Sequence, residues 1–195
     1  MSLVKISFQR HSSFFASLSS PFSIWPGSLI DFETTGRPGL DPSHEVIALG
    51  YMVSAQAVVL GRMTADKSSF YGVLAPLLES LPRPFLAYNA PFEMAVMTEE
   101  LGMQVAAEEF VDVMAPWRAK AESMGLKWPR LDELVSEPGE YFGEAHISGR
   151  DVPALWKEYL EERCEGAVRR IMEHCFSDLI REALLVVRHG SPFEG

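Results

Sequence analysis

Acidic side chains at regular spacings are the residues of this sequence best suited to chemistry. Asp31 and Glu33 lie two residues apart in a short apolar stretch typical of a strand, so both side chains should point to the same face. Glu93 follows a second short apolar stretch, at the start of an expected helix. His174 and Asp178 are four residues apart in a long helical segment and should share one of its faces.

Carboxylates from separated chain segments are the ligands that hard divalent cations prefer. In a two-metal site about 4 Å wide, one ion activates a water and the other stabilises the leaving oxygen. A histidine with a reference pKa of about 6.5 is suited to accept the proton of that water. The spacing also fits simpler interpretations: a capping acid at a strand end for Asp31 and Glu33, a solvated helix acid for Asp178, and for Glu93 a charge favoured at a helix N-terminus.

The elements that would position these residues follow from hydrophobic patterning. Strands are predicted at residues 3–8, 28–33, 45–60, 85–89 and 110–114, where 45–60 is one long strand or a hairpin broken near Ser54. Helices are predicted from 68 to the prolines at 82 and 84, from 91 to about 102, at 117–124 and 131–135, and as two helices over 152–187 that break at Gly166. This order predicts an α/β fold with helices packed around a sheet.

Length and composition predict one domain over residues 1–195. The 47% hydrophobic content is typical of a folded protein, and no apolar run is long enough for a membrane span, so we expect a soluble protein. Cys164 and Cys175 form neither a metal-type pair nor a disulfide framework, which favours a reducing, cytoplasmic location. Residues 1–27 are Ser-rich and lack acids; they are either a transit-like leader or an irregular or strand-forming extension of the domain.

The formal net charge of −10 argues against a protein that binds long nucleic acids by their phosphates. It does not exclude an enzyme that handles only a strand end, because bound divalent cations reverse the local field.

Three segments in order resemble the three motifs of the DEDD superfamily of 3′–5′ exonucleases: DFETTG (31–36), AYNAPFE (87–93) and HCFSD (174–178). The segment ISGRDVPALWKEYL followed by IMEHCFSD is similar to the YprB-like branch of that superfamily. The resemblance covers residues 28–187 and implies a ribonuclease H-like fold with a mixed central sheet flanked by helices.

The resemblance also implies a site and a reaction. Asp31 would bridge two divalent cations, Mg²⁺ or Mn²⁺, with Glu33 and Asp178 completing the tighter site. Glu93 would hold the looser ion mainly through water, and His174 would deprotonate the attacking water. The substrate would be the 3′ end of a single-stranded nucleic acid or a short oligonucleotide, and the products nucleoside 5′-monophosphates.

Four further residues are predicted to bind substrate. Thr34 and Thr35 would donate to phosphate or sugar, unless they form a plain turn. Asn89 and Phe92 would position the terminal nucleotide, unless they are a turn residue and a core aromatic. Asp112 is expected to be a structural acid at a strand end.

Two departures from the superfamily pattern are Glu93, where most members have Asp, and the lack of an obvious basic helix for binding substrate. His174 also stands four residues before Asp178 and not five, which matches the narrower branch. Glu93 and the acidic composition leave other functions open. The alternatives are a catalytically weak nucleic-acid-binding or scaffold module on the same fold, and a phosphodiesterase for very short oligonucleotides.

Overall fold

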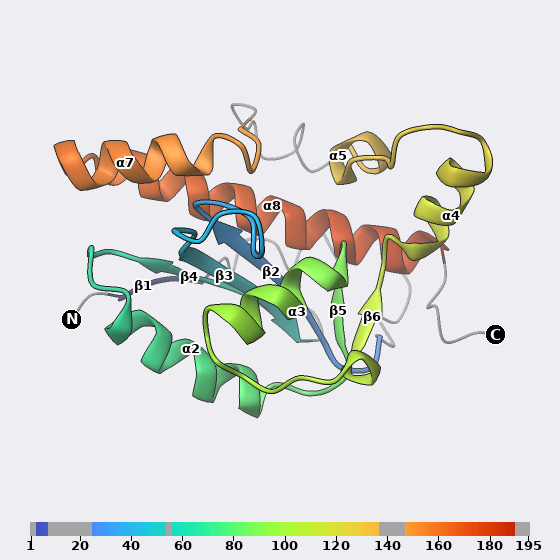
Figure 1. Cartoon of the computed structure of the whole chain (residues 1–195), viewed down its shortest axis with the longest axis horizontal. Helices are drawn as coiled ribbons and strands as arrows, with labels where there is room; N and C mark the ends of the chain where they lie inside the picture. Colours follow the sequence, from blue (N-terminus) through green and yellow to red (C-terminus); the bar gives the residue numbers. More distant parts are fainter. Residues whose placement is uncertain (1–2, 8–24, 54–55, 137–146, 190–195) are drawn as a thin grey trace.

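A mixed six-stranded sheet forms the centre of the protein, as the sequence predicts. The computed structural model describes residues 3–7, 25–53, 56–136 and 147–189 (Figure 1). The strands are β1 (Leu3–Ser7), β2 (Ser28–Thr34), β3 (Val46–Val53), β4 (Gln56–Arg62), β5 (Phe85–Ala87) and β6 (Phe110–Asp112), in the spatial order β1-β4-β3-β2-β5-β6. The pairs from β1 to β2 are antiparallel, whereas β5 and β6 run parallel to β2.

Helices cover both faces of this sheet. They are α2 (Ser68–Ser80), α3 (Ala90–Glu99), α4 (Ala115–Ser123), α5 (Leu131–Leu134), α7 (Val152–Glu162) and α8 (Glu165–His189), with a short 3₁₀ helix at Ala107–Glu109. Figure 1 shows α2 and α3 below the sheet and α5, α7 and α8 above it. Within the described residues, no helix is both long and apolar enough to cross a membrane.

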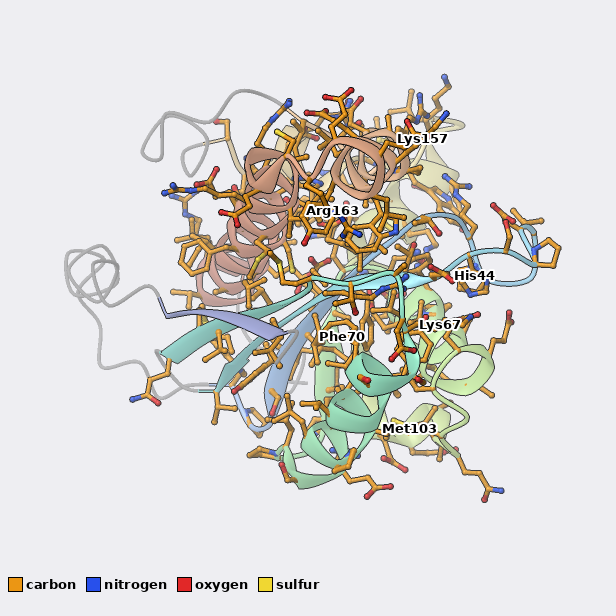
Figure 2. All side chains as sticks on the ribbon, turned by 90° about the vertical axis from the view of Figure 1, so that its left-hand side faces the viewer. His44, Lys67, Phe70, Met103, Lys157 and Arg163 are labelled. Atoms are coloured by element: carbon orange, nitrogen blue, oxygen red, sulfur yellow. The ribbon has the colours of Figure 1, made fainter. Side chains whose placement is uncertain are left out.

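The alternation of side chains along the strands divides the core between the two faces. Leu29 of β2 packs in the cluster that contains the buried faces of α7 and α8. The next residue, Ile30, packs in a second cluster with α2 and α3. Figure 2 shows side chains filling both layers, with Phe70 of α2 between that helix and the sheet. Asp31 and Glu33 therefore share the α8 face of β2 with Leu29.

Two glycines let α8 approach the sheet closely. A Cβ atom at Gly50 of β3 would stand 2.6 Å from Cδ1 of Leu179 and 2.7 Å from Sγ of Cys175. A Cβ atom at Gly61 of β4 would stand 2.6 Å from Sδ of Met172. Because the helix rests directly on these backbone positions, the residues next to its contact points, His174 and Asp178, are held near β2.

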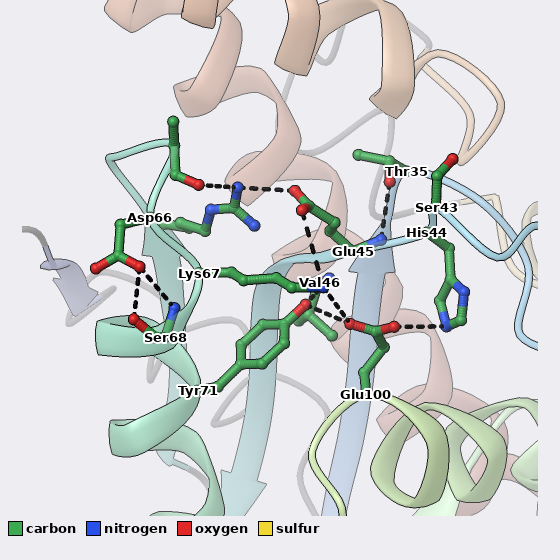
Figure 3. A network of polar contacts seen from close by, with 12 residues as sticks. Thr35, Ser43, His44, Glu45, Val46, Asp66, Lys67, Ser68, Tyr71 and Glu100 are labelled. Carbon is green, nitrogen blue, oxygen red and sulfur yellow. Dashed lines mark hydrogen bonds and ion pairs between the residues drawn. The ribbon is translucent and has the colours of Figure 1, made fainter.

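The loop between β2 and β3 is tied to the end of α3 by polar contacts (Figure 3). Thr35 and Glu45 close the loop with two hydrogen bonds, one from each backbone N–H. His44 Nδ1 lies 2.7 Å from the carbonyl oxygen of Asp41, and its Nε2 lies 3.6 Å from Glu100 Oε1. The loop that leaves the acidic strand is thereby fixed against a helix on the opposite face.

The predicted elements agree with the structure in type and order, although the ends of several differ by a few residues and one helix break was misplaced. The 45–60 run is a hairpin, although the expected break at Ser54 lies outside the described residues. The helix break was wrongly predicted at Gly166. It falls at Arg163, which adopts a left-handed conformation with φ 56°, and Gly166 lies in the first turn of α8. Of residues 1–27, which were left open, residues 3–7 pair with β4 and residues 8–24 lie outside the described part.

Candidate active site

The five residues predicted to act in catalysis line one cleft, although they come from three different elements. The cleft has a volume of about 770 Å³ and lies beside the C-terminal end of β2. Its lining includes Asp31 and Glu33 from β2, Glu93 from α3, and His174 and Asp178 from α8. The convergence is closest among Asp31, Glu33, His174 and Asp178. Glu93 lines the same cleft but belongs to neither group of candidate ligand atoms that lie within 4.8 Å of one another among the described residues.

The acids and the histidine lie close together, at ion-pair distance and not at hydrogen-bond distance. His174 Nε2 lies 3.7 Å from Glu33 Oε1 and 3.7 Å from Asp178 Oδ2. One ligand atom from each of these three residues falls within 4.8 Å of the others, and the same holds for Asp31, Glu33 and Cys175. Glu33 belongs to both groups and thus links the strand pair to α8.

Glu93 reaches the strand pair because of the way that α3 begins. Asn89 adopts a left-handed conformation with φ 77°, which turns the chain sharply after β5, and Pro91 stands in the first turn of the helix. This places Glu93 in that turn with only 3% of its surface exposed. An acid that only complements a helix dipole is usually exposed to solvent, whereas Glu93 is almost fully buried.

Burial and mutual repulsion make the carboxylates hard to ionise. Desolvation, followed by the charge of Asp178, raises the pKa of Asp31 to about 8. The pKa values of Glu33 and Glu93 are also raised, first by burial and then by the charge of Asp31. A backbone hydrogen bond from Phe32 to Glu93 offsets part of that rise. Positive charge brought into the cleft would relieve all of these shifts together.

The donor set fits divalent cations. Buried oxygens of the acids, Asp31 Oδ2 and Glu93 Oε2, have no hydrogen-bond partner within the described part of the chain. Buried polar atoms without partners are costly unless a ligand or ion satisfies them. Apart from His174 and Cys175, the residues of the two groups offer carboxylate oxygens as metal ligands. Oxygen is the ligand atom that Mg²⁺ and Mn²⁺ favour.

A fifth acid near the cluster, Glu182, was not predicted. It is 1% exposed, and its Oε1 accepts the backbone N–H of Tyr88 at 2.9 Å, in the turn that leads into α3. Its Oε2 has no hydrogen-bond partner among the described residues, and the charges of Asp31 and Asp178 raise its pKa after burial does. The available signal was its position one helical turn beyond Asp178, among apolar neighbours.

An arginine also reaches the cluster. Arg181 is 5% exposed, and its Nη1 donates to Asp178 Oδ1 at 2.6 Å. One oxygen of Asp178 thus faces a guanidinium while the other faces His174. This buried cation compensates part of the negative charge that α8 brings to the cleft.

The residues predicted to bind substrate divide into two groups. Thr34, Asn89 and Phe92 line the cleft, and the hydroxyl of Thr34 donates to the carbonyl of Gly36 at 2.6 Å. Thr35 is not part of the lining, and its hydroxyl accepts the N–H of Glu45 at 2.9 Å. A substrate role for Thr35 stays a prediction, and the contacts observed belong to the turn.

Asp112 has the structural role that the sequence favours. Its Oδ1 accepts the backbone N–H groups of Asn89 and Met114 at 3.2 and 3.0 Å. Its Oδ2 accepts from Arg118 at 2.6 Å. Asp112 therefore holds the start of α3 and the start of α4 together at the ends of β5 and β6.

Comparison with known families identifies the fold. A family model described as RNase_H superfamily, RNase_H_2, matches residues 29–189. The chain belongs to the RNase_H superfamily. The predicted ribonuclease H-like fold is therefore confirmed, and the matched region contains all of the cleft acids named above.

A solved structure with the same fold is a family B DNA polymerase from the hyperthermophilic archaeon Pyrobaculum calidifontis. The TM-score is 0.54 at 16% sequence identity, over 87% of this chain and 25% of the polymerase chain. This chain thus spans about a quarter of the polymerase's length, and the likeness is one of fold. The comparison with curated proteins found no match.

Proposed function

We propose that this protein is a metal-dependent 3′–5′ exonuclease that hydrolyses phosphodiester bonds at the 3′ ends of nucleic acids by a two-metal mechanism. The observation that carries the proposal is the convergence of the five predicted catalytic residues from β2, α3 and α8 on one cleft. Membership in the RNase_H superfamily supports a nuclease, and the structural likeness to a DNA polymerase supports nucleic acid as the substrate.

Four carboxylates would hold two Mg²⁺ or Mn²⁺ ions: Asp31, Glu33, Glu93 and Asp178. Bound there, the ions would supply a nucleophilic hydroxide and stabilise charge on the phosphate and the leaving oxygen. The raised pKa values of Asp31, Glu33 and Glu93 support this assignment, since cations would restore the ionised form that the buried cluster otherwise disfavours.

His174 would take the proton from the attacking water at Nε2. That nitrogen faces the carboxylates of Glu33 and Asp178, both at 3.7 Å, so the imidazolium formed by the transfer would be stabilised where it arises. The side chain is 11% exposed, which keeps it oriented while leaving it a path to the cleft.

The direct test is a cleavage assay with 5′-labelled single-stranded DNA, single-stranded RNA and dinucleotides in the presence of Mn²⁺ or Mg²⁺. We expect stepwise shortening from the 3′ end that is lost in Asp31→Ala and in EDTA. Glu161→Ala is the matched control, because Glu161 is an exposed acid on α7, outside the cleft. Tight binding of the oligonucleotides without any cleavage would overturn the proposal in favour of a binding module.

A second candidate function is a phosphodiesterase for very short oligonucleotides. The net charge of −10 favours it, because a long polyanion would be repelled by most of the surface. Cleavage of the dinucleotides alone, with longer strands left intact, is the result that would select it.

A further inference from the structure

The active-site cleft continues into a second cavity, and the proposed chemistry uses only the edge that the two cavities share. The second cavity has a volume of about 550 Å³, and it shares His174, Asp178 and Asn89 with the acidic cleft. Asp31, Glu33 and Glu93 line the first cavity and are not part of the lining of the second. Both volumes lie in the range of small-ligand sites, so the pair has room for two adjacent units of a substrate.

Trp128 stands where the two cavities meet and lines both. The residue is 52% exposed, which is unusual for a tryptophan. It is nevertheless fixed in place: the guanidinium carbon of Arg118 lies 4.7 Å from the ring centroid, and the indole N–H donates to Glu122 at 3.0 Å. Because these contacts come from α4, the exposed part of the ring is presented as a rigid aromatic surface at the cleft.

The position of this tryptophan is tied to the catalytic motifs. Arg118, which stacks on the ring, also donates to Asp112 at 2.6 Å, and Asp112 accepts the N–H of Asn89 in the turn before Glu93. A chain of contacts therefore runs from the aromatic surface to the acidic cleft. These contacts fix the position of the Trp128 ring relative to the acids of the cleft.

Positive charge lines the same cleft as the tryptophan, despite the acidic composition of the chain. Arg130 lines both cavities, and Arg37 and Arg150 line the acidic one. Arg37 and Arg150 are exposed, whereas Arg130 forms an exposed ion pair with Asp132, which is worth little energetically. An aromatic face flanked by arginines is the combination that binds unpaired bases by stacking and their phosphates by charge.

We propose that Trp128 is the stacking surface for the penultimate nucleotide, which lies on the 5′ side of the scissile phosphate. The second cavity would accept this nucleotide from a single strand. The inference rests on the proposed exonuclease function and specifies its substrate class. Stacking accepts any base because every base has a π-face, so the site selects unpaired 3′ ends and not a particular sequence. A base-paired end would first have to melt, since its faces are buried in the duplex stack.

The test compares Trp128→Ala and Trp128→Phe with Leu126→Ala. Leu126 is a matched control, because it is 60% exposed in the same segment but is not part of the lining of either cavity. Each variant is assayed with Mn²⁺ on a 5′-labelled single-stranded 12-mer and on the ester of thymidine 5′-monophosphate with the 3′ hydroxyl of an abasic deoxyribose. The ester has the same kind of leaving group as the 12-mer but no second base, so it cannot stack on Trp128.

Trp128→Ala should lower the ratio of kcat/KM on the 12-mer to kcat/KM on the ester by about 10-fold or more, mainly through KM. Trp128→Phe should keep most of the ratio, and Leu126→Ala should leave it unchanged. A ratio in Trp128→Ala equal to that of the unmodified protein would overturn the inference.

Binding of the labelled 12-mer in EDTA, followed by fluorescence anisotropy, separates this inference from the proposed function. The dissociation constant should rise about 10-fold in Trp128→Ala and not in Leu126→Ala. If the unmodified protein cleaves neither substrate but shows this binding difference, the stacking surface stands and the exonuclease proposal fails. If cleavage occurs and the binding difference is absent, the stacking surface fails and the exonuclease proposal stands.

Discussion

Asp31 is the residue on which the electrostatics of the cleft depend most clearly. Its pKa is about 8 in the folded protein, against 3.8 in the unfolded chain, because burial and the charge of Asp178 disfavour ionisation. A group whose pKa is raised by folding stabilises the folded state fully at a pH below its pKa in the unfolded chain. This contribution is lost as the pH rises through its pKa in the folded protein. The metal-free protein should therefore become less stable between about pH 4 and pH 8.

The measurement is the melting temperature in EDTA across this pH range, for the unmodified protein and for Asp31→Asn. We expect the unmodified protein to lose stability with rising pH more steeply than the variant, which lacks the titrating group. Equal slopes would show that Asp31 is not held in its protonated form by the fold.

Glu93 should have opposite effects on stability and on function. Glu93→Gln removes a carboxylate whose charged form is disfavoured by desolvation and by repulsion from Asp31. The unfolding free energy in EDTA should therefore rise by about 1 kcal/mol. Hydrolysis should fall by about 100-fold or more, because a metal ligand is lost. Urea unfolding and initial rates measure the two effects, and a variant that is less stable as well as inactive would indicate a structural role instead.

At the residue scale, the sequence predicted the acids on strands and near helix starts, and it missed the residues defined by long-range contacts. Asp31, Glu33 and Asp178 could be found because spacing along a strand or a helix fixes the face of a side chain. Glu182 accepts the N–H of Tyr88, which is 94 positions away in the chain, and Trp128 is held at the cleft by its tertiary contacts with Arg118 and Glu122 of α4. Local periodicity carries no information on either contact.

Among the elements, α8 has the largest effect on the site because it supplies His174, Asp178, Arg181 and Glu182. Its place depends on Gly50, where a Cβ atom would meet Cys175 and Leu179. Gly50→Ala should push the helix from the sheet and destabilise the protein by about 1–3 kcal/mol, the usual range for overpacking. It should also lower hydrolysis, because His174 and Asp178 would move with the helix.

Gly72→Ala is the control for this prediction. Gly72 lies on the exposed side of α2, where nothing stands within 4 Å of an added Cβ atom. The substitution should be neutral or stabilise the helix by up to about 1 kcal/mol. Chemical unfolding of both variants tests the pair, and an unchanged Gly50→Ala protein would show that the close approach of α8 is not required.

Element types were predictable from local patterns in the sequence, whereas their arrangement in space was predictable only through the resemblance to a known superfamily. The short apolar run of β2 and the prolines around α2 and α3 mark local structure. The pairing of residues 3–7 with β4 is a contact between segments about 55 residues apart, and no local pattern predicts it. The misplaced helix break has a similar origin: Arg163 takes the left-handed conformation that glycine usually adopts, so Gly166 was the misleading signal.

At the scale of the whole molecule, a net charge of −10 coexists with arginines at the cleft. If Arg37, Arg130 and Arg150 neutralise about three phosphates, the logarithm of the association constant for single strands should fall with the logarithm of salt concentration with a slope of about −2. Anisotropy titrations in EDTA at several salt concentrations give this slope. A value far steeper, near −6, would indicate a long basic track that the described residues do not form.

A calorimetric titration with Mn²⁺ of the unmodified protein and of Asp31→Asn tests most directly whether the clustered acids form a metal site. We expect two ions per chain in the unmodified protein and an affinity at least about 10-fold weaker in the variant, which lacks the carboxylate proposed to bridge the two ions. Binding of equal stoichiometry and affinity in both proteins would contradict the claim, because the ions would then occupy surface carboxylates away from the cleft.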